Sequence, residues 1–156
     1  MSVEGSAVVI TCSSRAAAGT YPDRSGPIIV EALRGWGLLV DDAVVVADGP
    51  DVEVALLAAI SSGAALVVTT RGTGLTPADG TPEATRLVVV RPLPGIAEAL
   101  RAAGVQAGLP SAMAAPGACG VAGRNVVVTL PCPTAGARGA APRPAPRFLP
   151  AVPCLP

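Results

Sequence analysis

Short runs of β-branched apolar residues alternate along this chain with segments of helical spacing. Residues 7–12 (AVVITC), 38–46 and 65–70 (ALVVTT) have the apolar character of buried strands. Between them, apolar side chains recur every three or four positions over residues 27–36 and 52–61, which predicts two helices. Because a βαβαβ order needs crossover connections, we predict an α/β fold: a three-layer, open, mostly parallel sheet with helices on both faces.

The alternation continues through the second half of the chain. Thr81 as N-cap, followed by Pro82 in the first turn, predicts the start of a helix. Residues 94–103 predict another helix, and residues 125–130 (NVVVTL) predict a further strand. The predicted domain therefore extends to residue 130.

The composition changes at that point. Residues 131–156 hold 8 of the 17 prolines and no acidic residue, and no helical periodicity is present there. Proline removes backbone donors and interrupts helices. We therefore predict a single domain over residues 1–130, followed by an irregular tail over residues 131–156 that is rich in Pro and Arg.

The residue types that are missing limit the chemistry. The chain has no His, and each of its 11 basic residues is Arg. A Ser/His/Asp triad, a Cys/His pair, an HExxH metal site, a P-loop lysine and a Schiff-base lysine are all excluded. Catalysis by this chain must use carboxylates, hydroxyls, guanidinium groups, backbone amides or a recruited metal ion.

Other features bear on location and partners. The four cysteines lack CxxC spacing and no secretory signal opens the chain, so we expect a cytoplasmic protein whose thiols pack as small hydrophobes. No apolar run reaches the roughly 18 residues of a membrane span. The arginines after Glu98 are scattered and aromatic residues are few, so we expect no nucleic-acid partner.

Ligands of open parallel sheets bind at the carboxyl ends of the strands. The loop after residue 70 is glycine-rich, and its backbone amides and hydroxyls could hold a phosphate group: Gly72, Thr73, Gly74 and Thr76. A tight turn that merely needs glycine is the alternative. Ser13, Ser14 and Arg15, which follow the first strand, could add hydroxyl and guanidinium contacts to the same anion, together with residues 23–26 (DRSG). The alternative is an ordinary loop before a helix capped by Ser25.

Two acidic residues follow strands at this same edge of the sheet. Asp79 ends the glycine-rich loop and could coordinate Mg²⁺, because hard cations prefer carboxylate oxygens. Asp48 follows the second strand and could converge with Asp79 on one cleft, which makes both candidate catalytic residues. The alternatives are a solvated turn residue for Asp79 and a helix-capping residue for Asp48.

Several motifs together resemble one enzyme family. The segments DRSGP (23–27), TTRGTGLTPAD (69–79), TPEAT (81–85), PGIAE (94–98) and GVAGR (120–124) are similar, in order and spacing, to the molybdopterin adenylyltransferases, the Mog/MoaB proteins. The resemblance implies a trimeric α/β fold and transfer of AMP from Mg-ATP to the terminal phosphate of molybdopterin. It also implies catalytic or metal-handling roles for Asp48 and Asp79, and a pterin- or phosphate-binding role for residues 72–74.

The resemblance further implies a cytoplasmic homotrimer that works beside a molybdenum insertase. The chain departs from the family pattern at Arg71, where the family has Gly, at 115–116 (AP), where it has Ser-Arg, and at 132–134 (CPT). One alternative is therefore a non-catalytic paralogue that binds the pterin or only forms trimers. Another is the related domain of nicotinamide-nucleotide amidases, which the length of 156 residues disfavours.

Overall fold

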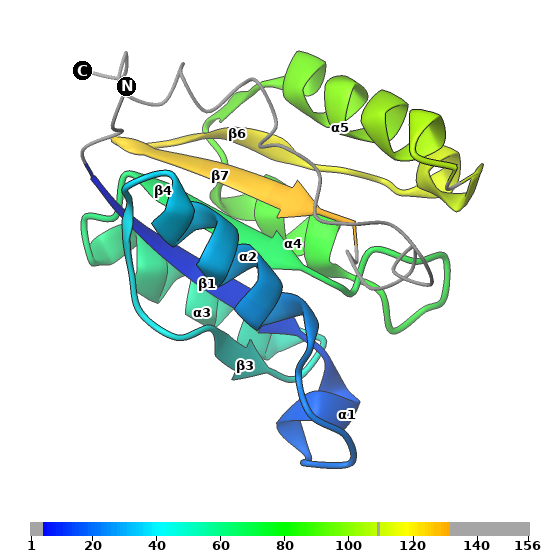
Figure 1. Cartoon of the computed structure of the whole chain (residues 1–156), viewed down its shortest axis with the longest axis horizontal. Helices are drawn as coiled ribbons and strands as arrows, with labels where there is room; N and C mark the ends of the chain where they lie inside the picture. The colour runs from blue at the N-terminus through cyan, green and yellow to red at the C-terminus, as the bar shows by residue number, and fades with distance from the viewer. Residues whose placement is uncertain (1–4, 109, 132–156) are drawn as a thin grey trace.

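The computed structural model describes residues 5–108 and 110–131, which form one sheet with helices on both sides (Figure 1). The strands are β1 (Ser6–Cys12), β2 (Leu39–Val40), β3 (Val44–Val46), β4 (Leu66–Thr70), β5 (Arg91–Pro92), β6 (Cys119–Ala122) and β7 (Asn125–Leu130). The helices are α1 (Ser14–Ala17), α2 (Ser25–Gly35), α3 (Pro50–Ser61), α4 (Thr81–Val88), α5 (Pro94–Gln106) and the 3₁₀ turn η1 (Pro110–Ala114). No helix within these ranges is long and apolar enough to cross a membrane.

The strand order is β2-β1-β4-β7-β6-β5, and β3 also pairs with β1. β1 runs parallel to β2, β3 and β4, and β4 runs parallel to β7, whereas β6 is antiparallel to β5 and β7. The predicted mostly parallel α/β sheet is therefore confirmed. Since parallel strands end at the same edge, the segments that follow β1, β3 and β4 meet there.

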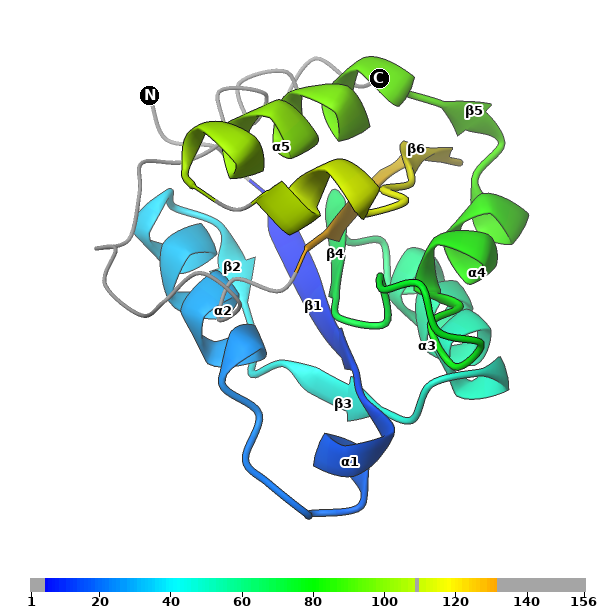
Figure 2. The ribbon, with the colours of Figure 1, turned by 90° about the vertical axis from the view of Figure 1, so that its right-hand side faces the viewer.

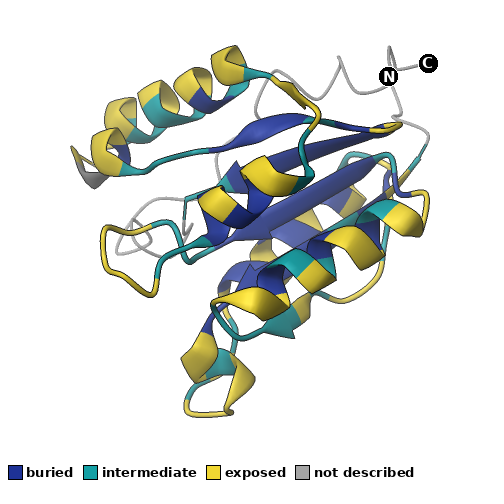
Figure 3. Cartoon of the chain, turned by 180° about the vertical axis from the view of Figure 1, so that it is seen from behind, coloured by how far each residue is buried: buried dark blue, intermediate teal, exposed yellow. Residues whose placement is uncertain are grey.

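Alternate residues of the central strands face opposite sides of the sheet. Val9 and Val68 pack in the core beneath α2 and α5, whereas Ile10 and Val67 pack in the core beneath α3 and α4. Figure 2 shows α2 to one side of β1 and β4, with α3 to the other. Helices thus cover both faces, which leaves the strands buried and the outer sides of the helices exposed (Figure 3).

Helix α2 begins at Ser25, earlier than the predicted start at residue 27. The N-cap residue is Arg24, whose side chain makes no capping bond. The preceding residue, Asp23, accepts hydrogen bonds at its Oδ1 from the backbone N–H groups of Ser25 (3.0 Å) and Gly26 (3.2 Å). Thr11 Oγ1 of β1 donates to the other carboxylate oxygen, Asp23 Oδ2, at 2.7 Å. The suggestion that Ser25 caps this helix is wrong, because Ser25 lies buried inside the first turn.

The predicted strand over residues 38–46 is two short strands, β2 and β3, separated by residues 41–43. A side chain from α2 accounts for the break. Arg34 Nε donates to the carbonyl oxygen of Val40 at 2.8 Å, and Arg34 Nη2 lies 3.3 Å from Asp42 Oδ1. That carbonyl oxygen bonds a guanidinium group at the point where β2 ends.

Helix α4 starts at Thr81 with Gly80 as N-cap, so the prediction of Thr81 as N-cap is wrong by one position. The backbone N–H of Thr81 donates to the carbonyl oxygen of Gly72 at 3.1 Å, which ties the helix start to the glycine-rich loop. The Thr81 hydroxyl does not cap this helix; it is buried and lies beside the Cys12 thiol.

Strand β6 was not predicted, because its sequence, CGVA, has only one β-branched residue. Gly120 permits the pairing: a Cβ there would overlap Val89 Cγ1 and lie 2.6 Å from the carbonyl oxygen of Arg91. The one-turn helices α1 and η1 were likewise not predicted. The predicted irregular tail lies outside the described residues from 132 onward.

Candidate functional site

A cavity of about 850 Å³ lies at the carboxyl ends of β1, β3 and β4. Each strand supplies a polar segment to its wall, and residues 112, 114 and 115 supply an apolar part. The structure brings together in this wall all of the residues predicted for the site: Ser13, Ser14, Asp48, Gly72, Thr73, Gly74, Thr76 and Asp79. Their roles in binding or catalysis remain predictions.

Asp48 is tied to the segment after β1 by three hydrogen bonds with Ser14. Asp48 Oδ2 accepts from the backbone N–H and from the hydroxyl of Ser14, at 2.9 Å each, and the backbone N–H of Asp48 donates to Ser14 Oγ at 3.0 Å. Helix α3, which follows, has Gly49 as N-cap and no side-chain cap. The helix-capping alternative for Asp48 is therefore wrong, and its carboxylate instead joins two neighbouring strand ends.

Asp79 is held inside its own loop. Its Oδ2 accepts hydrogen bonds from the Thr76 backbone N–H (3.1 Å) and from Thr76 Oγ1 (2.5 Å). The Thr76 hydroxyl bond, together with backbone bonds from Thr76 and Gly74, lowers the pKa of the Asp79 carboxyl below its ordinary value, although burial acts in the opposite direction. Asp79 is therefore a carboxylate at neutral pH.

Gly72 and Gly74 bring the loop backbone directly against the two acidic residues. Gly72 has a φ of +58°, and a Cβ there would overlap Thr81 Oγ1 and lie 3.0 Å from Asp48 Oδ1. A Cβ at Gly74 would lie 2.6 Å from Asp79 Oδ2. Any side chain at either position would force the carboxylates or the loop to move.

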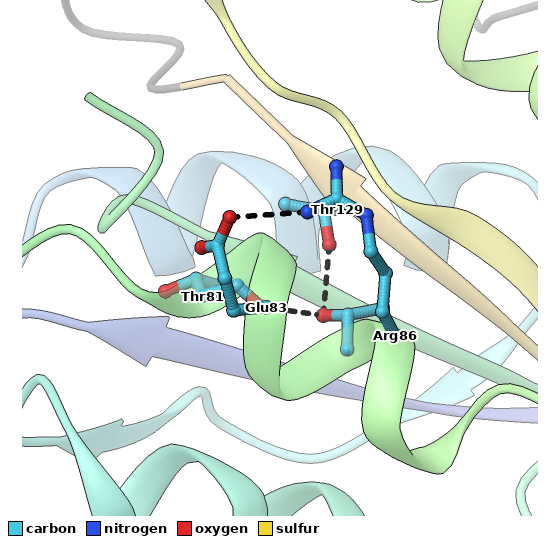
Figure 4. A network of polar contacts seen from close by, with 5 residues as sticks. Thr81, Glu83, Arg86 and Thr129 are labelled. Atoms are coloured by element: carbon cyan, nitrogen blue, oxygen red, sulfur yellow. Dashed lines mark hydrogen bonds and ion pairs between the residues drawn. The ribbon is translucent and has the colours of Figure 1, made fainter. Parts of the chain in front are cut away.

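A chain of buried threonine hydroxyls joins α4 to β4 and β7, and no sequence motif predicts it. Thr69 Oγ1 donates to Thr129 Oγ1 at 3.0 Å, Thr129 Oγ1 lies 3.1 Å from Thr85 Oγ1, and Thr85 Oγ1 donates to the Thr81 carbonyl oxygen at 2.8 Å. Figure 4 shows Thr81 and Thr129 in this network, beside the surface ion pair of Glu83 and Arg86. The network fastens the start of α4 to β4 and β7, and so fixes the end of the loop.

Cys12 lies in the cavity wall but is 1% exposed. Burial raises the pKa of the Cys12 thiol to about 11, outweighing a hydrogen bond from Thr81, and nearby Asp48 raises it further. Burial also raises the pKa of Cys119 to about 11. Both thiols are therefore protonated at neutral pH, and the prediction of small buried hydrophobes is confirmed for these two cysteines. Cys132 and Cys154 lie outside the described residues.

Three further side chains of the cavity wall were not predicted as part of a single cluster. Tyr21 lies with its ring centroid 5.5 Å from the guanidinium carbons of both Arg15 and Arg71. Arg71 Nη2 donates to the Tyr21 hydroxyl at 2.6 Å, and that hydroxyl lies 3.1 Å from Ser13 Oγ. The available sequence signal was Arg71 itself, a large residue inside a glycine-rich turn.

The chain is similar to known proteins of molybdenum cofactor biosynthesis. The family model described as a probable molybdopterin binding domain matches residues 8–146 of the chain. The chain is 35% identical over 127 residues to a molybdopterin adenylyltransferase of Helicobacter pylori, which covers 79% of this chain and 72% of that protein. It is also 48% identical over 99 residues to a molybdenum cofactor biosynthesis bifunctional protein of Synechococcus elongatus.

The match to the Synechococcus protein covers 63% of this chain but only 31% of that protein, so the chain spans less than a third of the length of this relative. Among solved structures, a molybdopterin biosynthesis protein from Mycobacterium abscessus has a TM-score of 0.80 at 39% identity. That match covers 86% of this chain and 85% of the other, so the likeness extends over nearly the whole described domain.

Proposed function

The chain belongs to the family of probable molybdopterin binding domains, and from that premise we propose that it transfers AMP from Mg-ATP to the terminal phosphate of molybdopterin. One observation carries the proposal. Two carboxylates, Asp48 and Asp79, lie against the two glycines of a single loop, in the wall of one cavity. This arrangement offers backbone amides to a phosphate group and acidic oxygens to its counter-ion.

The polar residues of the cavity wall form two groups: those whose hydroxyl already donates to a carboxylate, and those whose donors are left for a ligand. The distinction follows because a hydroxyl has a single proton to donate. The hydroxyl of Ser14 gives its proton to Asp48, and that of Thr76 gives its proton to Asp79. These two residues position the carboxylates. The Gly74 backbone N–H is also directed to Asp79, so the backbone amides of Gly72 and Thr73 and the Thr73 hydroxyl are the donors assigned to the phosphate.

The donor set suits Mg²⁺, which we propose is held by Asp79 with Asp48. Among residues 5–108 and 110–131, no cluster of three or more His, Cys, Asp or Glu side chains could enclose a metal ion. Mg²⁺ does not need one, because it keeps several water ligands and binds substrate phosphates directly. When bound, it would supply neutralisation of phosphate charge.

The proposed reaction needs no general base from the protein. A phosphate nucleophile is already ionised at neutral pH: its oxygen attacks the α-phosphorus of ATP, the new P–O bond forms as the bond between the α- and β-phosphates breaks, and pyrophosphate leaves. The chain must orient the two reacting phosphate groups and stabilise the charge that develops on them. A site built from amides, hydroxyls and carboxylates can do this. The lack of His and Lys in the sequence therefore does not count against the proposal.

An adenylyl-transfer assay on the purified chain tests the proposal. We expect an AMP adduct of molybdopterin to form when ATP and Mg²⁺ are present, and none when Mg²⁺ is chelated. Isothermal titration with molybdopterin and with ATP gives the complementary measurement. Binding of molybdopterin without turnover would favour the alternative, a non-catalytic pterin-binding paralogue.

We also propose that the chain acts as a cytoplasmic homotrimer and passes its product to a molybdenum insertase. Apolar side chains on the outer surface support association, because Leu87 is 72% exposed and Val90 is 83% exposed. Light scattering on the purified chain measures the mass of the assembly. A monomer at micromolar concentration would contradict the trimer.

A further inference from the structure

The most unusual backbone in the cavity belongs to Arg71. Its φ is +69°, and it is the one residue other than glycine with a positive φ in the described part of the chain. A non-glycine residue in this region of φ is strained and persists only when its surroundings hold it there. The chain has an arginine at a position where glycine would relieve this backbone strain, which points to a role for the guanidinium group.

The surroundings of Arg71 orient its side chain along the cavity wall. Arg71 Nη2 donates to the Tyr21 hydroxyl at 2.6 Å, and the guanidinium carbon lies 5.5 Å from the ring centroid. The same hydroxyl lies 3.1 Å from Ser13 Oγ, which fixes the phenol to the end of β1. The Tyr21 hydroxyl therefore links the end of β1 to the loop after β4.

A second positive charge, that of Arg15, also lies against Tyr21. The guanidinium carbon of Arg15 also lies 5.5 Å from the Tyr21 ring centroid, and Arg15, Tyr21 and Arg71 all line the cavity. Arg71 directly precedes the loop amides of Gly72 and Thr73, which can donate to anions, and Arg15 lines the same cavity. The planar donor fork of arginine matches the oxygens of a phosphoryl group.

We propose that Arg71, positioned by Tyr21 and reinforced by Arg15, binds a phosphoryl group of the substrate in this cavity. The inference deepens the proposed function and rests on it for the statement that the substrate carries phosphate. Two sources share this chemistry: the polyphosphate of a nucleotide and a phosphate monoester such as the terminal phosphate of a pterin. The opposing view is that Arg71 only obstructs the cavity.

Calorimetric titration of the whole chain with two simple probes tests the proposal without any turnover. The probes are pyrophosphate, for the nucleotide, and glycerol 3-phosphate, for the monoester, each at several salt concentrations. The first variant is Arg71→Asn, because Asn tolerates a positive φ while removing the charge. We expect binding of at least one probe to weaken by about 10- to 100-fold, with a shallower salt dependence.

Arg124→Asn is the matched control. Arg124 is exposed in the turn between β6 and β7, at the amino end of β7 and away from the cavity. This variant loses the same charge and should bind both probes as the unaltered chain does. Tyr21→Phe tests positioning: we expect binding several-fold weaker with an unchanged salt dependence, because the charge stays and only its hydrogen-bonded orientation is lost.

The pattern of losses identifies the source of the phosphoryl group. If Arg71→Asn weakens the binding of pyrophosphate alone, Arg71 binds the nucleotide. If it weakens the binding of glycerol 3-phosphate alone, Arg71 binds the phosphate monoester. If it weakens the binding of both probes, Arg71 binds a phosphoryl group from either source. Unchanged binding in Arg71→Asn, an equal loss in Arg124→Asn, or no binding of either probe by the unaltered chain overturns the inference. Weakened binding in a chain that never transfers AMP would overturn the proposed function alone.

Discussion

The two carboxylates of the cavity are held in opposite ways. Asp48 is bonded to Ser14, which lies 34 positions earlier in the sequence, on a different strand end. Asp79 is bonded to Thr76, only 3 positions earlier, within one exposed turn. Asp48 therefore depends on the pairing of β1 with β3, whereas Asp79 depends on the conformation of its own loop.

This difference separates what each residue can reveal. A change at Asp48 disturbs both the chemistry of the site and the join between two strand ends. A change at Asp79 alters the charge at the site with little effect on packing, because an exposed turn contributes little to the core. Variants at the two positions should therefore agree in activity and differ in stability.

Replacement of Asp79 by Asn should have the largest effect on the proposed reaction. We expect adenylyl transfer to fall by about 100- to 1000-fold, because the substitution removes a carboxylate charge from the proposed metal site. The melting temperature should stay within about 2 °C of that of the unaltered chain. Asp51→Asn, at an exposed position in the first turn of α3, is the control and should keep full activity. Unchanged turnover in Asp79→Asn would remove Asp79 from the mechanism.

Replacement of Asp48 by Ala should reduce transfer by about 100-fold and also lower the melting temperature by about 3 °C, because the bonds from Ser14 are lost. Assays of turnover and thermal melting by circular dichroism measure the two effects. Asp42→Ala removes an exposed carboxylate that pairs with Arg34 on the surface and should change neither greatly. A full loss of activity with no change in melting would show that the join at Ser14 contributes nothing to stability.

Replacement of Ser14 by Ala leaves the Asp48 carboxylate in place and removes only its hydroxyl partner. The backbone N–H of Ser14 still donates to Asp48 Oδ2, so we expect a loss of transfer of about 10-fold or less. Ser62→Ala is the matched control, since the Ser62 hydroxyl donates to the Ala59 carbonyl oxygen at the end of α3. A loss as large as that of Asp48→Ala would mean that Ser14 contacts the substrate directly.

The same contrast explains how much the sequence could predict. Parallel strands end at one edge, so Asp48 and the loop after β4 could be assigned to one cleft from strand order alone. Local turn chemistry likewise made Asp79 a candidate. The bond between Asp48 and Ser14 needed the observed pairing of β1 with β3, which a predicted long single strand over residues 38–46 obscured.

What could not be predicted depended on contacts between distant side chains. Tyr21 and Arg71 are 50 positions apart, and nothing in either local sequence indicates that they touch. The strand at Cys119–Ala122 has no strong β pattern and forms because Gly120 lets the backbone approach Val89. The threonine network likewise joins β4, β7 and α4 through hydroxyl groups whose directions only the fold determines.

The smallest expected effect, and the one that isolates the local anchoring of Asp79, comes from Thr76→Val. Loss of the Thr76 hydroxyl should raise the pKa of the Asp79 carboxyl toward its ordinary value, because that hydrogen bond is the main cause of the lowered pKa. Transfer at pH 7 should fall only a few-fold, since the carboxylate stays ionised there.

The same variant should also change how stability and activity depend on pH below neutrality. Because the Asp79 pKa is lower in the folded chain than in the unfolded chain, ionised Asp79 stabilises the fold at a pH above its ordinary pKa. This contribution to the free energy of unfolding is lost as the pH falls through the pKa of the folded state. Thr76→Val should therefore lose less stability on acidification, while its activity declines at a higher pH. A carbon-detected NMR titration of the Asp79 carboxyl measures the pKa directly.

Thr73→Val is the matched control, because Asp79 takes its side-chain hydrogen bond from Thr76 and not from Thr73. An Asp79 pKa that is the same in both variants would show that the loop backbone alone sets the charge of this residue.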